Sequence, residues 1–328
     1  MNRTASGRGD FWYFIRMAKQ WDKRFGEVLV WLTMWALFAA DAGAQDLEPR
    51  RWSHLPTGMN VIGASTIWTD GEIFSDPVAR LQDATFERYT LSSSYVRTFE
   101  WLGKSSRIDF ALPYVAARWE GLLDGDYVST RRHGFSDPFV RFSMSLYGAP
   151  PLKGMKYVQY RASHPVTTTV GAAIAVTLPF GEYYADRLIN LGNNRYVVRP
   201  QLGVLHQRGP WQFEVTTTVS FYEDNADYFG GARLEQDAMW FLQGHVIRAL
   251  PRNMWVSVSG GFSYAGESRI DGVALDNDDH TRYLSLSFGM PITNQQSVKI
   301  TWINADTNVI IGSASDTLVL GWSLNWGL

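Results

Sequence analysis

The chain ends with the stretch TLVLGWSLNW, residues 317–326, in which large apolar side chains alternate with small or polar ones. The apolar parity carries Leu318, Leu320, Trp322, Leu324 and Trp326. The other parity carries Val319, Gly321, Ser323 and Asn325. Successive side chains of a β-strand point to opposite faces, so the stretch predicts a strand with one apolar face. That face needs a partner, which is either a protein core or lipid.

The same alternation recurs along most of the chain, whereas helical periodicity is rare. We predict strands near residues 60–69, 86–98, 106–119, 135–147, 167–180, 195–206, 211–222, 238–248, 254–264, 281–290, 297–304 and 316–326. A soluble β-sandwich or propeller is the alternative, but no further elements remain to cover the apolar faces. The pattern therefore predicts an all-β fold, a transmembrane antiparallel up-and-down β-barrel of about 12 strands. Lipid covers its apolar face, and small or polar side chains line its lumen.

The connections between these strands alternate in length. Short connections with turn-forming residues lie at 101–106, 207–210, 249–253 and 292–296, and the connection 148–166 is the exception. Long acidic ones lie at 69–83, 223–237 and 266–280. This alternation is typical of short periplasmic turns and long outer loops. An even number of strands places both chain ends of the barrel on the periplasmic side, and its last strand pairs with its first.

The N-terminal region has the pattern of a secretory signal peptide. Basic residues precede the apolar run VLVWLTMWALFAA (28–40), and Ala42-Gly43-Ala44 provides a small-x-small cleavage site. A transmembrane anchor is the alternative, but 13 apolar residues fall short of the roughly 20 that span a bilayer. We predict residues 1–44 as an extension plus cleaved signal peptide, with Met17 as an alternative start. Residues 45–59 then form a periplasmic segment or a plug, and 60–328 form the barrel.

Composition excludes several classes of function. The net charge is −2, whereas a nucleic-acid-binding protein normally carries a basic surface, so no nucleic-acid partner is expected. The chain contains no Cys, which excludes thiolate zinc sites, disulfides and Cys nucleophiles. No Gly-rich phosphate-binding loop is present, and no cofactor is predicted.

Several polar and charged side chains share the lumen-facing parity of their strands. They are Asp109, Arg141, Arg199, Gln201, Glu214, Gln243, His245 and Lys299. A charge on the lipid face at mid-bilayer costs roughly 2–4 kcal/mol, so these residues belong in the lumen. One interpretation is a constriction in which Arg141, Arg199 and Lys299 hold a carboxylate or phenolate. The other is that the charges pair across a plugged lumen and stabilise it. The sequence leaves both open.

Two further groups of residues have candidate roles at the membrane surface. An interfacial aromatic girdle is predicted from Trp68, Trp119, Trp211, Trp255, Trp322 and Trp326, which lie near strand ends. Asp276, Asp278 and Asp279 are spaced closely enough to share Ca²⁺ or Mg²⁺. No Gly stands where a calcium loop requires one, so solvated acidic loop tips are the favoured interpretation and no metal site is predicted.

A catalytic site is not favoured by the sequence. A lipid hydrolase needs a nucleophilic Ser with a His and an orienting group in reach. His206 and His245 are the candidate bases, but neither is accompanied by a GxSxG motif, and the six His are scattered. We therefore predict that the protein is not an enzyme.

Four stretches resemble the outer-membrane proteins grouped as "putative MetA-pathway of phenol degradation". They are LEPRRWSHLPTGMN (47–60), NRYVVRPQLGVLHQRGPW (194–211), FYEDNADYFGG (221–231) and SDTLVLGWSLNW (315–326). The resemblance covers essentially the whole chain after residue 44. It implies an outer-membrane barrel of a Gram-negative bacterium, named for an association with aromatic catabolism. It carries over no catalytic residues.

These observations together predict an outer-membrane channel for passive diffusion of small, partly hydrophobic organic molecules, aromatic ones included. Its expected partners are outer-membrane lipids and lipopolysaccharide, the barrel-assembly machinery and a small organic solute. A closed structural or surface-interaction barrel is the alternative, and an outer-membrane lipid hydrolase is a third, less favoured one.

Overall fold

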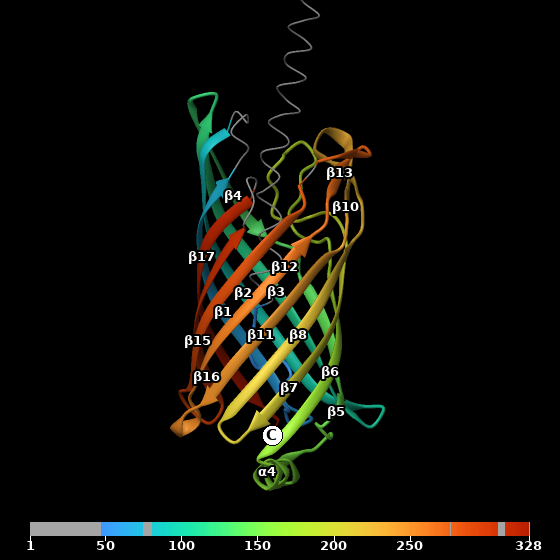
Figure 1. Cartoon of the computed structure of the whole chain (residues 1–328), viewed down its shortest axis with the longest axis vertical. Coiled ribbons are helices and arrows are strands. Elements are labelled where there is room, and N and C mark those ends of the chain that lie inside the picture. Colours follow the sequence, from blue (N-terminus) through green and yellow to red (C-terminus); the bar gives the residue numbers. More distant parts are fainter. Residues whose placement is uncertain (1–46, 75–80, 276, 308–311, 328) are drawn as a thin grey trace, which may run out of the picture.

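The computed structural model describes residues 47–74, 81–275, 277–307 and 312–327. It is a closed antiparallel barrel (Figure 1). The predicted signal peptide, residues 1–44, lies outside the described residues. Among the residues that are described, no helix is both long and apolar enough to cross a bilayer.

The barrel wall has twelve strand positions, which confirms the predicted fold. Eleven positions are single strands: β1 (Asn60–Phe74), β2 (Leu81–Trp101), β3 (Lys104–Leu123), β6 (Val166–Thr177), β7 (Val197–Arg208), β8 (Trp211–Tyr222), β11 (Met239–Ala249), β12 (Trp255–Ala265), β15 (Asp279–Pro291), β16 (Gln296–Thr307) and β17 (Gly312–Trp326). The remaining position is shared by β4 (Asp126–Phe135) and β5 (Phe139–Tyr147), which both pair with β3.

The C-terminal strand closes the barrel. β17 pairs with β1 in an unbroken antiparallel register from Asn60 opposite Trp326 to Phe74 opposite Gly312. Closure pairs the first strand of the wall with the last, so neither presents an open edge to the hydrocarbon. The stretch 317–326 therefore has the place that its alternation predicts.

The two faces of the wall follow the sequence alternation, with apolar side chains outside and polar ones inside. On β7 the exposed fraction is 57% for Leu202 and 2% for its neighbour Gln201. On β8 it is 53% for Val215 and 1% for Thr216. The apolar exterior is the surface that lipid covers in a transmembrane barrel.

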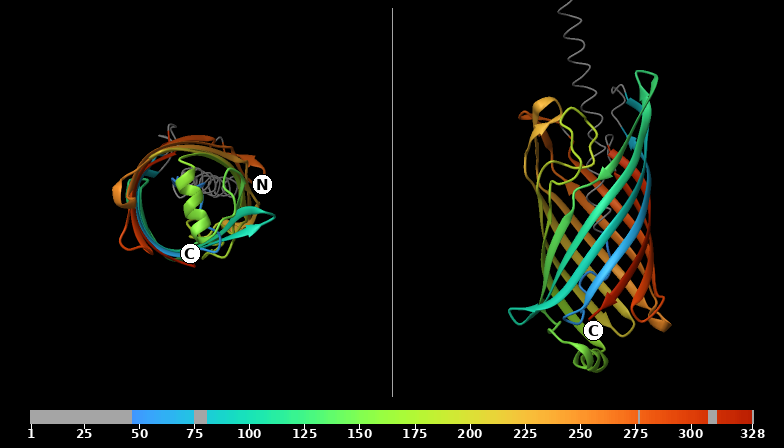
Figure 2. Two further views of the ribbon diagram at one scale, coloured as in Figure 1. Left: turned by 90° about the horizontal axis from the view of Figure 1, so that it is seen from below. Right: turned by 180° about the vertical axis from the view of Figure 1, so that it is seen from behind.

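The two ends of the barrel differ. We call one the turn end: it carries the short connections, the C-terminal residues and the helix α4 (Gly154–Ser163) (Figure 1). The other, the loop end, carries the longer connections with β9 (Asn225–Tyr228), β10 (Ala232–Gln236), β13 (Ser268–Ile270) and β14 (Val273–Ala274). Two 3-10 turns complete the described elements, η1 (Phe229–Gly231) and η2 (Pro251–Asn253). α4 was not predicted; it lies across the mouth of the turn end (Figure 2).

Candidate functional site

Residues 47–59, which we call the inner segment, lie inside the barrel and run from the loop-end half of the wall to the turn end. Leu47 packs in an apolar cluster with Phe241 and Tyr283 of the wall. The amide of Thr57 donates to the carbonyl of Leu152 over 2.8 Å, and the amide of Gly58 donates to that of Thr98 over 2.9 Å. The described part of the region 45–59 thus lies inside the lumen.

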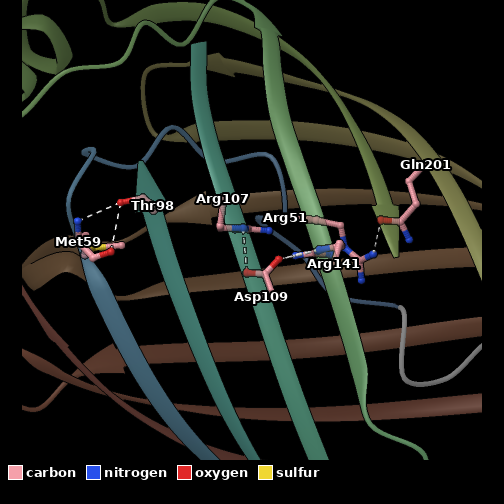
Figure 3. A network of polar contacts seen from close by, with 7 residues as sticks. All are labelled: Arg51, Met59, Thr98, Arg107, Asp109, Arg141 and Gln201. Carbon is pink, nitrogen blue, oxygen red and sulfur yellow. Dashed lines mark hydrogen bonds and ion pairs between the residues drawn. The ribbon is translucent and has the colours of Figure 1, made fainter. Parts of the chain in front are cut away.

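Glu214 on β8 binds the backbone of the inner segment. Its carboxylate accepts the amide of Arg51 over 3.0 Å and the amide of Trp52 over 3.3 Å. The Arg51 side chain also donates through Nη1 to Oε1 of Gln201 over 3.2 Å (Figure 3). Two polar residues predicted to face the lumen, Gln201 and Glu214, are therefore occupied by the inner segment rather than left free for a solute.

The side chain of Trp52 packs against the inner wall at positions where the wall residues are small. Its indole Nε1 donates to Oγ1 of Thr216 over 2.8 Å, and its ring packs against Leu205. A Cβ at Gly171 or Gly203 would overlap the indole ring. Glycine is needed at these two positions because the ring lies directly on the backbone of β6 and β7.

Asp109, Arg107 and Arg141 form a buried ion-pair network on the inner wall. Asp109 on β3 lies opposite Arg141 on β5 in the sheet register, and Arg141 Nη2 lies 2.7 Å from its Oδ2. Arg107 Nε lies 3.0 Å from Oδ1 of the same carboxylate (Figure 3). Arg141, a predicted constriction residue, is thus paired with a wall carboxylate.

The remaining lumen candidates have separate partners. His245 contacts Oγ of Ser259 through Nδ1 over 2.7 Å and Oε1 of Gln243 through Nε2 over 3.0 Å. Arg199 Nη2 donates to Oγ1 of Thr177 over 2.5 Å. Lys299 Nζ donates to Oε1 of Glu48, in the inner segment, over 2.9 Å. Gln201, Glu214 and Lys299 thus bind the inner segment and the other candidates bind residues of the wall, so the eight do not form a single cluster.

A cavity of about 920 Å³ extends along the lumen from the turn end to the loop end. Asn253 and Asn325 line it at the turn end, and Leu188 and Tyr228 line it at the loop end. Arg51 and Trp52 of the inner segment are bound to β7 and β8, whereas much of the cavity follows the inner faces of β1, β2 and β17. The inner-facing positions of β1 from Val61 to Thr69 all line it.

The cavity wall is mixed in character and mainly cationic. Of the described residues that line it, six are cationic: Arg50, Arg88, Arg107, Arg195, Arg199 and Lys299. Two are anionic, Glu48 and Asp137. Apolar side chains such as Ile67, Val115 and Val319 lie between these charges. Such a surface suits a solute with an apolar body and a negative group.

The connection 178–196 contributes Tyr183 and residues 188–193 to the lining of the cavity at the loop end. Asp137, at the break between β4 and β5, accepts the amide of Gly181 over 2.9 Å and that of Asn193 over 2.7 Å. Burial raises the pKa of this carboxyl, while the two amides act in the opposite sense. Arg195 follows, with its guanidinium 4.7 Å from the ring centroid of Tyr222 and bonded to Gln236. The break in the fourth strand position thus provides the carboxylate that holds this connection inside.

The predicted aromatic girdle needs correction at two positions. Trp68, Trp211, Trp322 and Trp326 are exposed on the outer face. Trp119 instead packs with Phe86 and lines the cavity, and Trp255 lines the cavity beneath Arg50. Both were wrongly assigned to the girdle because nearness to a strand end was used without parity. They share the inward parity of Ala117 and Ser257.

The acidic and catalytic candidates are not gathered into a site. Asp276 lies outside the described residues, and Asp279 accepts a bond from Thr281. In the part of the chain that the structure describes, no three His, Asp or Glu side chains are placed to hold a metal ion. His206 contacts Oγ1 of Thr168 over 2.9 Å. The Ser259–His245 contact is buried beside Gln243. The amide of Gln243 contacts His245 where a hydrolase has the carboxylate that orients its His.

Sequence reasoning missed Glu48, Arg51 and Trp52 as lumen residues. The paired Arg50-Arg51 and the adjacent Trp52 are a partial indication in the sequence that this region has a role. It also missed Arg88 and Arg107, which share the inward parity of Thr90 and Asp109 on their strands.

Residues 72–311 match the model of the family described as "Putative MetA-pathway of phenol degradation". The chain belongs to this family. The resemblance noted in the sequence is thereby confirmed. A comparison with curated protein sequences gave no significant match.

Similar solved structures are outer-membrane barrels. An outer membrane channel from Pseudomonas putida F1 is 19% identical, with a TM-score of 0.71 over 86% of this chain and 100% of that one. The transport unit of the autotransporter AIDA-I from Escherichia coli is 8% identical, with a TM-score of 0.49 over 92% of this chain and 97% of that one. The first of these likenesses shows that the fold is that of an outer-membrane barrel.

Proposed function

We propose that the protein is an outer-membrane channel through which small, partly hydrophobic organic molecules diffuse passively, carboxylated aromatics among them. The observation that carries this proposal is the cavity of about 920 Å³ lined by residues of both barrel ends. Although Arg51 and Trp52 of the inner segment are bound to β7 and β8, the cavity still lines the inner faces of β1, β2 and β17. The family description and the channel from Pseudomonas putida F1 are in keeping with such a role.

The charges of the cavity support a preference for anions. Its described lining holds six cationic residues and two anionic ones. Fixed charges of one sign in a narrow lumen raise the local concentration of the opposite ion. The apolar side chains between them favour an organic anion over chloride by burying its hydrocarbon part.

The test is single-channel conductance of the purified protein in a planar bilayer, with benzoate, chloride and potassium as competing ions. We expect stable openings that prefer anions and that benzoate partly blocks. Arg199→Ala is expected to weaken the anion preference, whereas Arg282→Ala, which removes an exposed arginine from the outer face of β15, is expected to leave it unchanged.

A closed structural barrel is the second candidate, and the bonded inner segment is the observation that favours it. Under that function the barrel inserts into the bilayer but passes no current. Insertion without current would therefore contradict the channel and support the closed barrel. Faster migration of unheated than of boiled protein on a denaturing gel verifies that the silent protein is folded.

A further inference from the structure

The ion pair between Glu48 and Lys299 is open to the cavity. Lys299 Nζ and Glu48 Oε1 lie 2.9 Å apart, and both residues line the cavity. The exposed fraction of the side chain is 51% for Glu48 and 29% for Lys299. For the Asp109–Arg141 pair these fractions are only 10% and 9%. A dissolved molecule can therefore reach the first pair without unfolding the wall.

Glu48 is held in this position by residues on both sides of it. Leu47 is anchored in the apolar cluster with Phe241 and Tyr283, and Arg51 and Trp52 are bound by Glu214. The ammonium group of Lys299 lowers the pKa of the Glu48 carboxyl, so Glu48 is ionised at neutral pH. The inner segment thus presents a fixed carboxylate to a cation on the wall.

The surroundings of Lys299 suit the apolar part of an organic acid. In the register of the sheet, Lys299 lies between two glycines, Gly289 on β15 and Gly321 on β17. The indole of Trp255 covers Gly289, where a Cβ would overlap its ring. The space over Gly321 is open, since the nearest atom to a Cβ built there is the Lys299 carbonyl oxygen at 3.9 Å. An aromatic wall therefore lies on one side of the ammonium group and free volume on the other.

A second cation lies beside the same aromatic wall. The Arg50 guanidinium is 5.3 Å from the ring centroid of Trp255, and both side chains line the cavity. The positive charge around the site is therefore greater than that of Lys299 alone, and one carboxylate from the inner segment does not neutralise it. A carboxylate from solution would meet the same donors that now face Glu48.

We propose that Glu48 occupies the binding position of a solute carboxylate, and that small aromatic carboxylates exchange with it at Lys299. The ring of the solute lies in the space over Gly321, beside Trp255. This inference rests on the proposed channel and specifies its solute class and binding subsite. The displaced Glu48 carboxylate turns into the open cavity, where it is already half exposed, so exchange buries no unpaired charge.

The test is isothermal titration calorimetry of benzoate into the detergent-solubilised full-length barrel, compared with the Glu48→Gln variant. An exposed ion pair contributes little, so removing the internal competitor is expected to raise benzoate affinity roughly two- to fivefold. Glu87→Gln is the matched control. It removes the same charge from the outer face of β2, where Trp68 and Tyr89 bind that carboxylate, and should leave the affinity unchanged.

Lys299→Met completes the test, because it removes the ammonium group and keeps most of the side-chain volume. Benzoate binding is expected to be lost in this variant and in the double variant Glu48→Gln/Lys299→Met. Acetate lacks the ring, and we expect it to bind the wild-type protein more weakly than benzoate does. An affinity that is unchanged or lowered by Glu48→Gln would overturn the proposal, as would undiminished binding in Lys299→Met. Calorimetry reads binding without current, so a silent barrel that still binds benzoate refutes the channel and leaves the subsite standing.

Discussion

Gly203→Ala is expected to displace the inner segment from the lumen wall. The added methyl group would overlap the indole ring of Trp52, which lies directly on the β7 backbone. Trp52 can then keep neither its packing against Leu205 nor its hydrogen bond to Thr216. Losing the packing of a buried Trp typically costs about 3–5 kcal/mol, which changes the ratio of bound to released segment by roughly 10²- to 10⁴-fold.

Trypsin cleavage after Arg50 and Arg51 measures this release. In the wild-type barrel Arg51 is buried beneath Glu214 and Gln201, so cleavage there should be slow. In Gly203→Ala it should become rapid, and single-channel conductance should rise because the segment no longer occupies the lumen. The wall itself should stay folded, since the backbone of Gly203 does not require a glycine conformation.

Gly321→Ala is the matched control for this prediction. Gly321 also faces the lumen from the middle of a strand, but an added methyl group there meets open space. Protection of Arg50 and Arg51 should therefore remain as in the wild type. Equal protection in Gly203→Ala would show that Trp52 is not the anchor and that Glu214 holds the segment by itself.

The strands could be predicted from the sequence because alternation is a local property. Each of the twelve positions overlaps a predicted strand, and the largest difference is β4 at the loop end, of which only Phe135 lies in a predicted strand. There the outer face is exposed to water and carries charged pairs such as Arg118–Glu120, so the apolar parity that marks a strand is lost.

The contents of the lumen could not be predicted in the same way. The bonds of Glu214 to the inner segment join residues 163 and 162 positions apart, and no local pattern relates them. Trp255 is different, because it shares the parity of Ser257 and Ser259 and could have been placed inside from the sequence. Trp119 could not have been placed inside in this way. The neighbouring inward-facing residues, Ala117 and Val115, are apolar, so polarity does not mark the inner face there.

Asp109→Asn is expected to cause a large loss of stability, because it removes the carboxylate that both Arg107 and Arg141 bind. Arg141 and Asp109 are almost fully buried on the inner wall. Removing one partner of a buried pair typically costs 3–5 kcal/mol, since the remaining charge is left without compensation. Urea unfolding of the refolded barrel in lipid vesicles measures this change in the free energy of unfolding.

Glu120→Gln on the same strand is the control, because it breaks an exposed pair with Arg118 that should contribute only about 0–1 kcal/mol. The comparison also separates the two roles that the sequence allows for the lumen charges. If Asp109→Asn destabilises the barrel but leaves the anion preference of the surviving channels intact, the Asp109–Arg141 pair is structural. Selectivity then depends on cations that line the cavity, such as Arg199 and Lys299. A shift in anion preference with no loss of stability would reverse that assignment, and Arg141 would belong to the path of the solute.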